Sequence, residues 1–223
     1  MSAMLQIHTI VSMPFQENTY IVWQPDRHDA LVIDPGLDPD SILEYLVDQN
    51  LNVAAILDTH GHADHIAGNG PLKERYPDAP VVIGATDAVM LHDPVLNLSA
   101  PFGFSVLSPP ADRLVQEGDV LEYAGIRLDV LDLPGHSPGH VVFAWRGPSL
   151  PDGQGEQTIV FGGDVLMRGS VGRGDFPGGS SEQLASSIRS KLYKMPDDTV
   201  VYPGHGPVTT IGHEKRTNPF VRP

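Results

Sequence analysis

The sequence predicts a single α/β domain, a sandwich of sheets and helices. Its 223 residues fall within the range of one such domain, and a hydrophobic content of 40% supplies a sizeable core. Short apolar runs of strand length alternate with segments of helical periodicity, and several of these runs lead directly into histidine or aspartate. We therefore expect one domain over residues 1–223, with its chemistry at the ends of strands.

The first part of the chain is expected to form strands and helices in alternation. Apolar runs predict strands over residues 4–11, 19–23, 30–33 and 53–57. A helix is predicted over residues 40–49, because its apolar residues fall on one face and would pack on a sheet. Asp38 or Asp40 would cap it. Residues 66–76 have helical character that ends at Pro77.

A long loop is predicted in the middle of the chain. Residues 87–91 are a short helix candidate, and residues 92–112 hold four prolines and show little periodicity. Loops of this length often shape access to a site. We therefore expect residues 92–112 to lie on the surface near the functional groups.

The second half of the chain is expected to be β-rich and to end in helices. Strand patterns run from residue 115 to 161, interrupted by the polar segment 147–157, which we interpret as a hairpin insertion. A helix over residues 181–193, capped by Ser180 or Ser181, precedes the last predicted strand at 199–202.

One motif concentrates metal-binding groups. Residues 59–65 read Thr-His-Gly-His-Ala-Asp-His, which places three imidazoles and a carboxylate within one short turn. A histidine-rich surface loop is the ordinary alternative for such a motif. Here, however, a predicted strand precedes the motif and a predicted helix follows it, which indicates a metal site held at a strand end.

Three later segments each bring a further ligand to the end of a predicted strand. The segments are Pro-Gly-His-Ser-Pro-Gly-His at 134–140, Phe-Gly-Gly-Asp at 161–164 and Tyr-Pro-Gly-His-Gly-Pro at 202–207. Imidazole nitrogen and carboxylate oxygen suit Zn²⁺, Fe²⁺ or Mn²⁺. The chain contains no cysteine, so it has neither a Cys-rich structural zinc site nor disulfides or thiol chemistry. The cluster therefore indicates a catalytic metal centre.

On these motifs the chain resembles the metallo-β-lactamase-fold hydrolases, over residues 60–205. It is most similar to their glyoxalase II branch, the hydroxyacylglutathione hydrolases, in the compact form without a separate helical domain. The segments 134–140 and 169–176 support that branch, although Gly174 stands where the family usually has threonine. The resemblance implies a four-layer αβ/βα sandwich with metals at one edge, between the two sheets.

The resemblance also implies the ligands. Seven residues would bind two divalent ions: His60, His62 and His136 one ion, Asp64, His65 and His205 the other, with Asp164 bridging them. Zinc is the expected metal, with iron and manganese as alternatives. Asp64 is also expected to act in catalysis.

The implied activity is hydrolysis of a small acyl-thioester, with S-lactoylglutathione or a similar hydroxyacylglutathione as the candidate substrate. A metal-bridging hydroxide would attack the carbonyl, and the good thiolate leaving group makes a strong general acid dispensable. Two alternatives stay open. One is an Fe²⁺-dependent persulfide dioxygenase of the same fold, and the other is a metal-binding scaffold without catalysis.

A few residues are expected to support the site. His140 is interpreted as a supporting histidine, and Asp58 either orients a ligand imidazole or simply ends a strand. Arg173 and Asp175 are expected to form an ion pair, with recognition of a substrate carboxylate as the alternative for Arg173. Lys215 and Arg216 could supply charge for an anionic thiol or be merely solvated.

Charge and patterning restrict the partners. A formal net charge of −14 argues against nonspecific binding to nucleic acid or to an anionic membrane. The first twenty residues show no secretory signal pattern, and no run is long and apolar enough to span a bilayer. We expect a cytoplasmic enzyme with a small-molecule substrate, and the sequence does not fix its oligomeric state.

Overall fold

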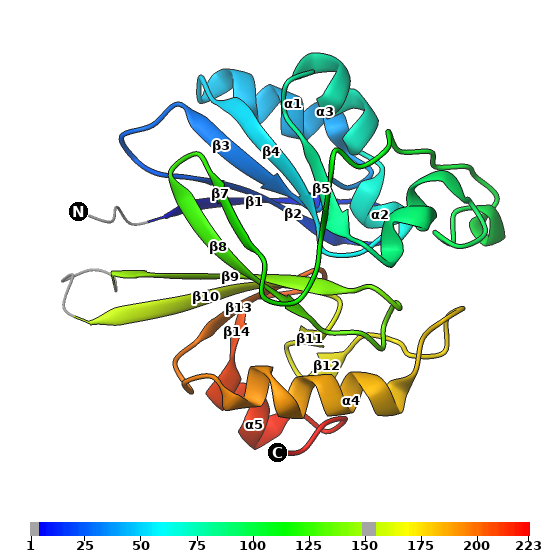
Figure 1. Ribbon diagram of the computed structural model, residues 1–223, viewed down its shortest axis with the longest axis vertical. Helices are drawn as coiled ribbons and strands as arrows, with labels where there is room; N and C mark the ends of the chain where they lie inside the picture. The colour runs from blue at the N-terminus through cyan, green and yellow to red at the C-terminus, as the bar shows by residue number, and fades with distance from the viewer. Residues whose placement is uncertain (1–4, 149–154) are drawn as a thin grey trace.

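Two six-stranded sheets face each other and form the centre of the molecule (Figure 1). The computed structural model describes residues 5–148 and 155–223. The start of the first predicted strand at residue 4 and most of the predicted insertion at 147–157 lie outside these residues. The insertion is flanked by two antiparallel strands that pair up to Pro148 and Glu156, as a hairpin requires.

The first sheet has the order β1-β2-β3-β4-β5-β6. Its strands are β1 (Gln6–Ser12), β2 (Glu17–Trp23), β3 (Asp29–Ile33), β4 (Asn52–Asp58), β5 (Val81–Gly84) and β6 (Arg113–Val115). The strands from β3 to β6 run parallel to one another, whereas β1, β2 and β3 form antiparallel pairs. The parallel arrangement brings the carboxyl ends of β3, β4 and β5 to one edge.

The second sheet has the order β14-β13-β10-β9-β8-β7. Its strands are β7 (Val120–Tyr123), β8 (Ile126–Asp132), β9 (Val141–Pro148), β10 (Glu156–Gly163), β13 (Val200–Pro203) and β14 (Thr209–Thr210). A separate small pair is formed by β11 (Leu166–Met167) and β12 (Ser170–Val171). Because β10 and β13 are parallel, their carboxyl ends also share one edge.

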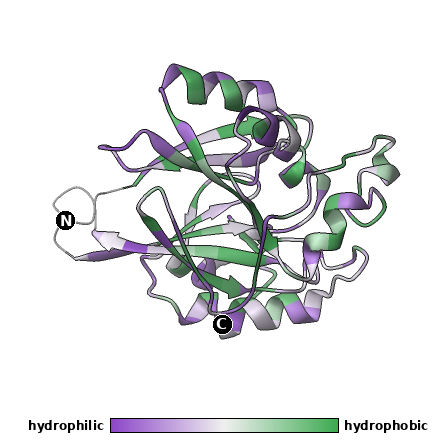
Figure 2. Ribbon diagram, turned by 45° about the horizontal axis from the view of Figure 1, so that its top comes forward, coloured by the Kyte–Doolittle hydropathy of each residue, from purple (hydrophilic) through white to green (hydrophobic). Residues whose placement is uncertain are grey.

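Helices cover the outer faces of both sheets. The helices α1 (Pro39–Asp48) and α3 (Asn69–Arg75) lie on the first sheet, and α4 (Ser181–Ser190) and α5 (Ile211–Thr217) lie on the second (Figure 1). One apolar core fills the space between the sheets, where Tyr20, Phe143 and Phe161 are buried, and two further cores join each sheet to its helices. Figure 2 shows hydrophobic residues along the central strands and mixed hydropathy along the outer helices. The four-layer αβ/βα sandwich is therefore confirmed.

Helix starts follow the predicted caps. The Asp38 side chain accepts a hydrogen bond from the Ser41 amide at the start of α1, and the Ser180 hydroxyl accepts one from the Gln183 amide at the start of α4. Such caps satisfy backbone donors that have no partner within the helix. The short helix predicted over residues 87–91 is a 3₁₀ helix, η1 (Asp87–His92), and the loop after it contains one further short 3₁₀ turn, η2 (Ala100–Phe102).

The helix predicted over residues 66–76 is wrong in its extent. A first helix, α2 (Ala63–Ile66), already begins inside the metal motif. The helix is then interrupted, and a second helix, α3, starts at Asn69. The break occurs because Gly68 packs against Pro35 and donates its amide hydrogen to the Pro35 carbonyl at 2.8 Å. The predicted helix over 181–193 likewise ends as α4 at Ser190, followed by a 3₁₀ turn, η3 (Leu192–Lys194).

In the part of the chain that the structure describes, no helix combines the length and apolarity needed to cross a membrane.

Candidate metal centre

All seven predicted ligands meet at the edge where strands of both sheets end. The motif after β4 supplies four of them: His60 and His62 precede α2, with His62 as its N-cap, and Asp64 and His65 lie within it. The other three follow strands of the second sheet: His136 after β8, Asp164 after β10 and His205 after β13. The two sheets are joined at this point by a hydrogen bond from the Val141 amide to the Thr59 carbonyl.

His60, His62 and His136 form one cluster, which we call the histidine group. The His62 Nδ1 atom lies 3.0 Å from His60 Nε2 and 2.9 Å from His136 Nε2. All three side chains are buried, with at most 4% of any residue exposed. Three imidazole nitrogens that converge in this way are a suitable donor set for Zn²⁺ or another borderline cation.

Asp64, His65 and His205 form a second cluster, which we call the mixed group. The Asp64 Oδ2 atom lies 3.4 Å from His205 Nε2 and 3.9 Å from His65 Nε2. The His65 side chain is fully buried, whereas Asp64 and His205 keep 20% and 24% of their side-chain surface exposed. This cluster is therefore the more open of the two.

Asp164 lies between the two groups. Its Oδ2 atom is 3.4 Å from His136 Nε2 and 3.5 Å from His205 Nε2, and its Oδ1 atom is 3.6 Å from His65 Nε2. A turn at Gly163, which has a φ of 46°, places the carboxylate there. A Cβ atom at this position would overlap Thr59, so a glycine is required on both counts.

The donor atoms of this centre fit a pair of divalent cations. His65 Nε2 and Asp164 Oδ1 are buried and have no hydrogen-bond partner. Leaving buried polar atoms unpaired costs about 1–3 kcal/mol each. A cation held between the clusters would satisfy both atoms, and the nitrogen and oxygen donors suit zinc, iron or manganese.

Hydrogen bonds fix the orientation of three of the predicted ligand imidazoles. The Nδ1–H of His136 donates to the Arg173 carbonyl at 2.8 Å, and that of His205 donates to the Phe15 carbonyl at 3.0 Å. The Nδ1 atom of His60 lies 3.1 Å from the Thr59 hydroxyl. In each case Nε2 is left with a lone pair that points into the centre, which is the tautomer that a metal ligand needs.

Asp34 is a supporting residue that the sequence analysis missed. Its carboxylate accepts hydrogen bonds from the Thr59 amide and hydroxyl, each at 2.7 Å, and from His65 Nδ1 at 3.1 Å. The Thr59 hydroxyl gives its hydrogen to Asp34 and can therefore accept one from His60. Asp34 directly follows β3, so the rule that found the ligands, a polar residue at a strand end, also applies to it.

Two predictions about supporting residues have different outcomes. His140 accepts a hydrogen bond from the Asp164 amide at 3.1 Å, which agrees with a supporting role. Asp58 instead accepts a hydrogen bond from the Asn69 side chain at 2.7 Å. The orienting role considered for Asp58 is wrong, because Asp34 is the carboxylate that contacts the ligand imidazole.

The charges in the two groups shift pKa values in opposite directions. Burial lowers the pKa of His60 well below its ordinary value and that of His62 to about 3, and neighbouring imidazoles add to the effect. Burial also acts to lower the pKa of His65, but the carboxylates of Asp64, Asp164 and Asp34 outweigh it and raise the pKa well above its ordinary value. His205 follows the same pattern, with its pKa raised mainly by Asp64 and Asp164 against burial. Carboxylates that attract a proton to these imidazoles also attract a metal cation.

A cavity of about 380 Å³ opens onto the centre. Its floor includes His62, His136 and His205, and its walls are largely aromatic and aliphatic. The Phe176 ring packs edge-on against the imidazoles of His62 and His136, with centroids 5.4 and 5.8 Å apart. The long loop 92–112 contributes one wall, as predicted for a segment that shapes access.

Arg173 and Asp175 form the predicted ion pair at the cavity rim. The guanidinium donates two hydrogen bonds to the carboxylate, at 2.8 and 2.7 Å, and lies 4.4 Å from the centre of the Phe176 ring. Both side chains are 65% exposed, so the pair is a surface feature. The loop that carries Arg173 supports the metal centre, because the Arg173 carbonyl accepts a hydrogen bond from His136.

Fold and site together define a metallo-hydrolase of the αβ/βα sandwich class. The chain belongs to the metallo-β-lactamase superfamily, whose model matches residues 12–205. It is similar to the hydroxyacylglutathione hydrolase GloC of Haemophilus influenzae, with 36% identity over 97% of this chain and 98% of that protein.

Two solved structures are also similar to this chain. The B3 metallo-β-lactamase BLEG-1 has a TM-score of 0.88 at 34% identity, covering 97% of this chain and 99% of that one. TTHA1623, solved in a di-iron-bound form, has a TM-score of 0.80 at 40% identity, covering 96% of this chain and all of that one.

Proposed function

We propose that this protein hydrolyses a small acyl-thioester, with S-lactoylglutathione or a similar hydroxyacylglutathione as the leading candidate substrate. The observation that carries the proposal is the convergence of two donor groups on Asp164, without any thiolate donor. The similarity to a hydroxyacylglutathione hydrolase along nearly the whole chain supports the choice of substrate.

The proposed ligands are the seven residues of the two groups and Asp164. When bound, two divalent ions would supply a hydroxide nucleophile at neutral pH and positive charge for the developing oxyanion. We propose zinc as the metal, with iron and manganese as alternatives.

The chain's own residues position these groups. Asp34, Thr59, the Phe15 carbonyl and the Arg173 carbonyl hold the imidazoles so that their lone pairs point inward. The imidazoles of His65 and His205 lower the pKa of Asp64 against the effect of burial, so this residue remains a carboxylate at neutral pH. We propose Asp64, in its charged form, as a catalytic residue.

A thioester suits a site without a dedicated general acid. A thiolate derived from a thiol of pKa about 8.5 leaves without prior protonation far more readily than an amine does. Rate enhancement would then depend mainly on stabilising charge on the carbonyl oxygen.

A persulfide dioxygenase is the second candidate. The di-iron-bound form of TTHA1623 supports iron as a metal for a site of this kind, although the dioxygenase would use only one ion. In that case one Fe²⁺ would be held by two histidines and Asp164. The mixed group would then be supporting residues.

Metal analysis combined with two assays tests the proposal. Freshly purified protein is analysed for metal content and assayed with S-lactoylglutathione and, in an oxygen electrode, with glutathione persulfide. About two metals per chain, with thioester turnover and no oxygen uptake, would support the hydrolase. About one iron per chain with oxygen consumption would favour the dioxygenase. Stoichiometric metal without turnover of either substrate would favour the inactive scaffold, and turnover by metal-free protein would contradict the mechanism.

We also propose that the protein acts in the cytoplasm on a small molecule and does not bind nucleic acid or membranes. The net charge of −14 supports the absence of binding to nucleic acid and anionic membranes, because binding to polyanions requires a positive surface.

A further inference from the structure

The walls of the cavity differ on its two sides. On the side of His205, the wall includes Phe15, whose carbonyl holds His205, and Phe102, which packs against Phe15. On the side of His136, the wall includes Arg173, whose carbonyl holds His136, and the ring of Phe176. The two sides of a thioester would therefore meet different surroundings.

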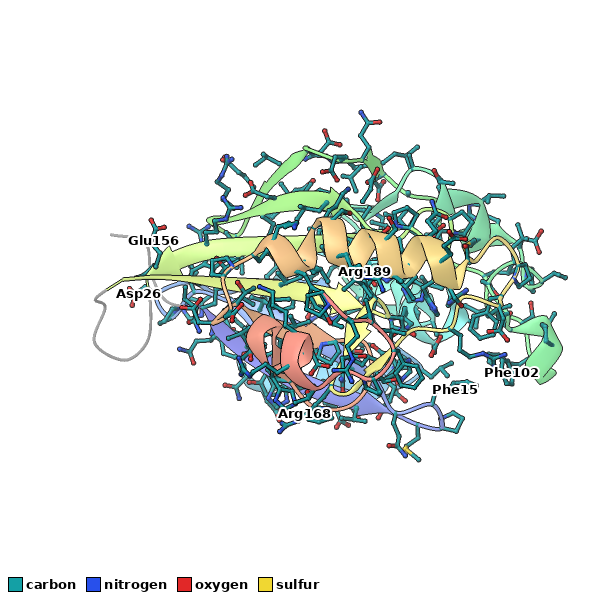
Figure 3. All side chains as sticks on the ribbon, turned by 90° about the horizontal axis from the view of Figure 1, so that it is seen from below. Phe15, Asp26, Phe102, Glu156, Arg168 and Arg189 are labelled. Atoms are coloured by element: carbon teal, nitrogen blue, oxygen red, sulfur yellow. The ribbon has the colours of Figure 1, made fainter. Side chains whose placement is uncertain are left out.

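The apolar wall continues beyond the metal centre. Phe15, Phe102 and Phe104 also line a second, adjoining hollow together with Met13 and Leu37. The rings of Phe15 and Phe102 pack edge to face with centroids 5.1 Å apart, and Figure 3 shows these two residues side by side at one end of the molecule. We call this surface, formed by Met13, Phe15, Leu37, Phe102 and Phe104, the aromatic groove.

Large apolar side chains of the groove are open to solvent. Phe102 is 61% exposed and Met13 is 63% exposed. Exposed apolar surface that adjoins a reactive centre is typical of a binding groove for apolar ligands. A hydrocarbon group laid along it would remove both partners from water.

One cation lines the cavity. Among the described lining residues, Arg173 is the only lysine or arginine, and its Nε and Nη2 atoms donate to Asp175. The Lys215 ammonium lies 2.7 Å from an Asp197 carboxylate oxygen, and Arg216 lies 4.0 Å from the same carboxylate. Neither residue lines the cavity, so the role considered for them with an anionic thiol is not supported.

We propose that the aromatic groove binds an uncharged hydrocarbon acyl chain, so that among unsubstituted acyl groups, which lack the hydroxyl of a lactoyl group, the protein prefers those of several carbons over short ones. This inference rests on the proposed thioester hydrolysis. The acyl chain is assigned to the groove because the thiolate that leaves carries charge, which a purely apolar wall disfavours, whereas the guanidinium of Arg173 on the other side keeps its Nη1 free of the Asp175 pair and tolerates it. Hydrolysis breaks the bond between carbonyl carbon and sulfur, and water supplies the hydroxyl of the acid and the proton of the thiol.

A series of acyl chains on one small neutral thiol tests the inference. Metal-loaded protein is assayed with acetyl, butyryl, hexanoyl and octanoyl thioesters of N-acetylcysteamine, and kcat/KM is compared along the series. We expect kcat/KM to rise about fourfold for each methylene that the groove buries. Phe102→Ser should flatten this rise, whereas Phe220→Ser, which changes an equally exposed phenylalanine (65%) in a different cavity, should not.

Binding of inert analogues separates this inference from the proposed function. S-(2-oxoalkyl) thioethers of N-acetylcysteamine keep the carbonyl but cannot be hydrolysed, and their affinity is measured by calorimetry. If no thioester is turned over, the proposed function fails, and an affinity that rises with chain length and is lost in Phe102→Ser still supports the groove. If thioesters are turned over but kcat/KM and affinity are both independent of chain length, the inference is overturned and the proposed function stands. A flat series together with a dimer that Phe102→Ser converts to a monomer would assign the groove to a second copy of the chain and also overturn it.

Discussion

The histidine group and the mixed group lie side by side but differ in charge and in access to water. The histidine group is buried and consists of three imidazoles, two of which have lowered pKa values. The mixed group contains a carboxylate, is partly exposed, and its two histidines have raised pKa values. One edge of the fold can therefore hold two candidate metal sites that differ in charge and solvent exposure. The difference in pKa comes from the carboxylates next to the mixed group.

The largest expected effect comes from removing a histidine of the buried group. In His62→Ala we expect activity to fall by several orders of magnitude, because the donor nitrogens of His60 and His136 both lie within 3.0 Å of the lost Nδ1 atom. The fold should survive, since the His62 side chain makes no capping hydrogen bond to α2. Turnover, metal content and circular dichroism measure these effects.

The exposed His92 provides a matched control for that variant. His92→Ala should keep both activity and metal content. If His62→Ala retained near-normal turnover, the histidine group would not be part of the reactive centre.

A smaller effect is expected from the carboxylate behind the mixed group. Asp34→Asn replaces an acceptor of three hydrogen bonds by an amide that cannot accept all of them. Because such supporting residues orient ligands, we expect activity or metal affinity to fall by about 10- to 100-fold. Metal affinity, measured by competition with a chelator, should fall more for the ion of the mixed group than for the ion of the histidine group.

The exposed Asp26 serves as the control, and Asp26→Asn should behave like the unchanged protein. Equal weakening of both ions in Asp34→Asn would show that the two groups are more tightly coupled than their geometry indicates.

Acidification should release metal from the mixed group first. His65 and His205 have raised pKa values, so as the pH falls they bind protons before His60 and His62 do, and protons compete with the metal. We expect metal content to fall in two steps, with the first loss from the mixed group. Metal analysis after dialysis at stepwise lower pH measures the order.

The identity of the first ion lost can be read from a cobalt-substituted sample, whose absorption spectrum depends on the ligands. If the first step removed the ion held by the three imidazoles of the histidine group, the predicted order of metal loss would be wrong.

The smallest effect is expected at the rim. Asp175→Asn breaks an ion pair in which both partners are 65% exposed, and pairs of this kind contribute little to stability. We expect no measurable change in melting temperature or metal content. A loss of metal in Asp175→Asn would instead mean that the pair is needed to keep the Arg173 carbonyl on His136.

The predictions from sequence succeeded where the signal was local. Asp38 and Ser180 cap helices because a short polar side chain reaches backbone amides only three residues away. The prediction failed at residues 66–76, where local periodicity favoured one helix. A contact between Gly68 and Pro35, 33 residues earlier in the chain, divides it.

The sequence by itself determined the donor set of this protein. Residue type decides which atoms can bind a metal, and the spacing within residues 59–65 places four candidates at one strand end. Tertiary structure alone decided what holds and surrounds these donors. The Phe15 carbonyl reaches His205 across 190 positions of the chain, Asp34 reaches His65 across 31, and the aromatic groove is formed by segments far apart in sequence. The contact of Phe15 with His205 depends on how the two sheets pack together, and the other contacts depend on the order of strands within the first sheet. No local pattern encodes either.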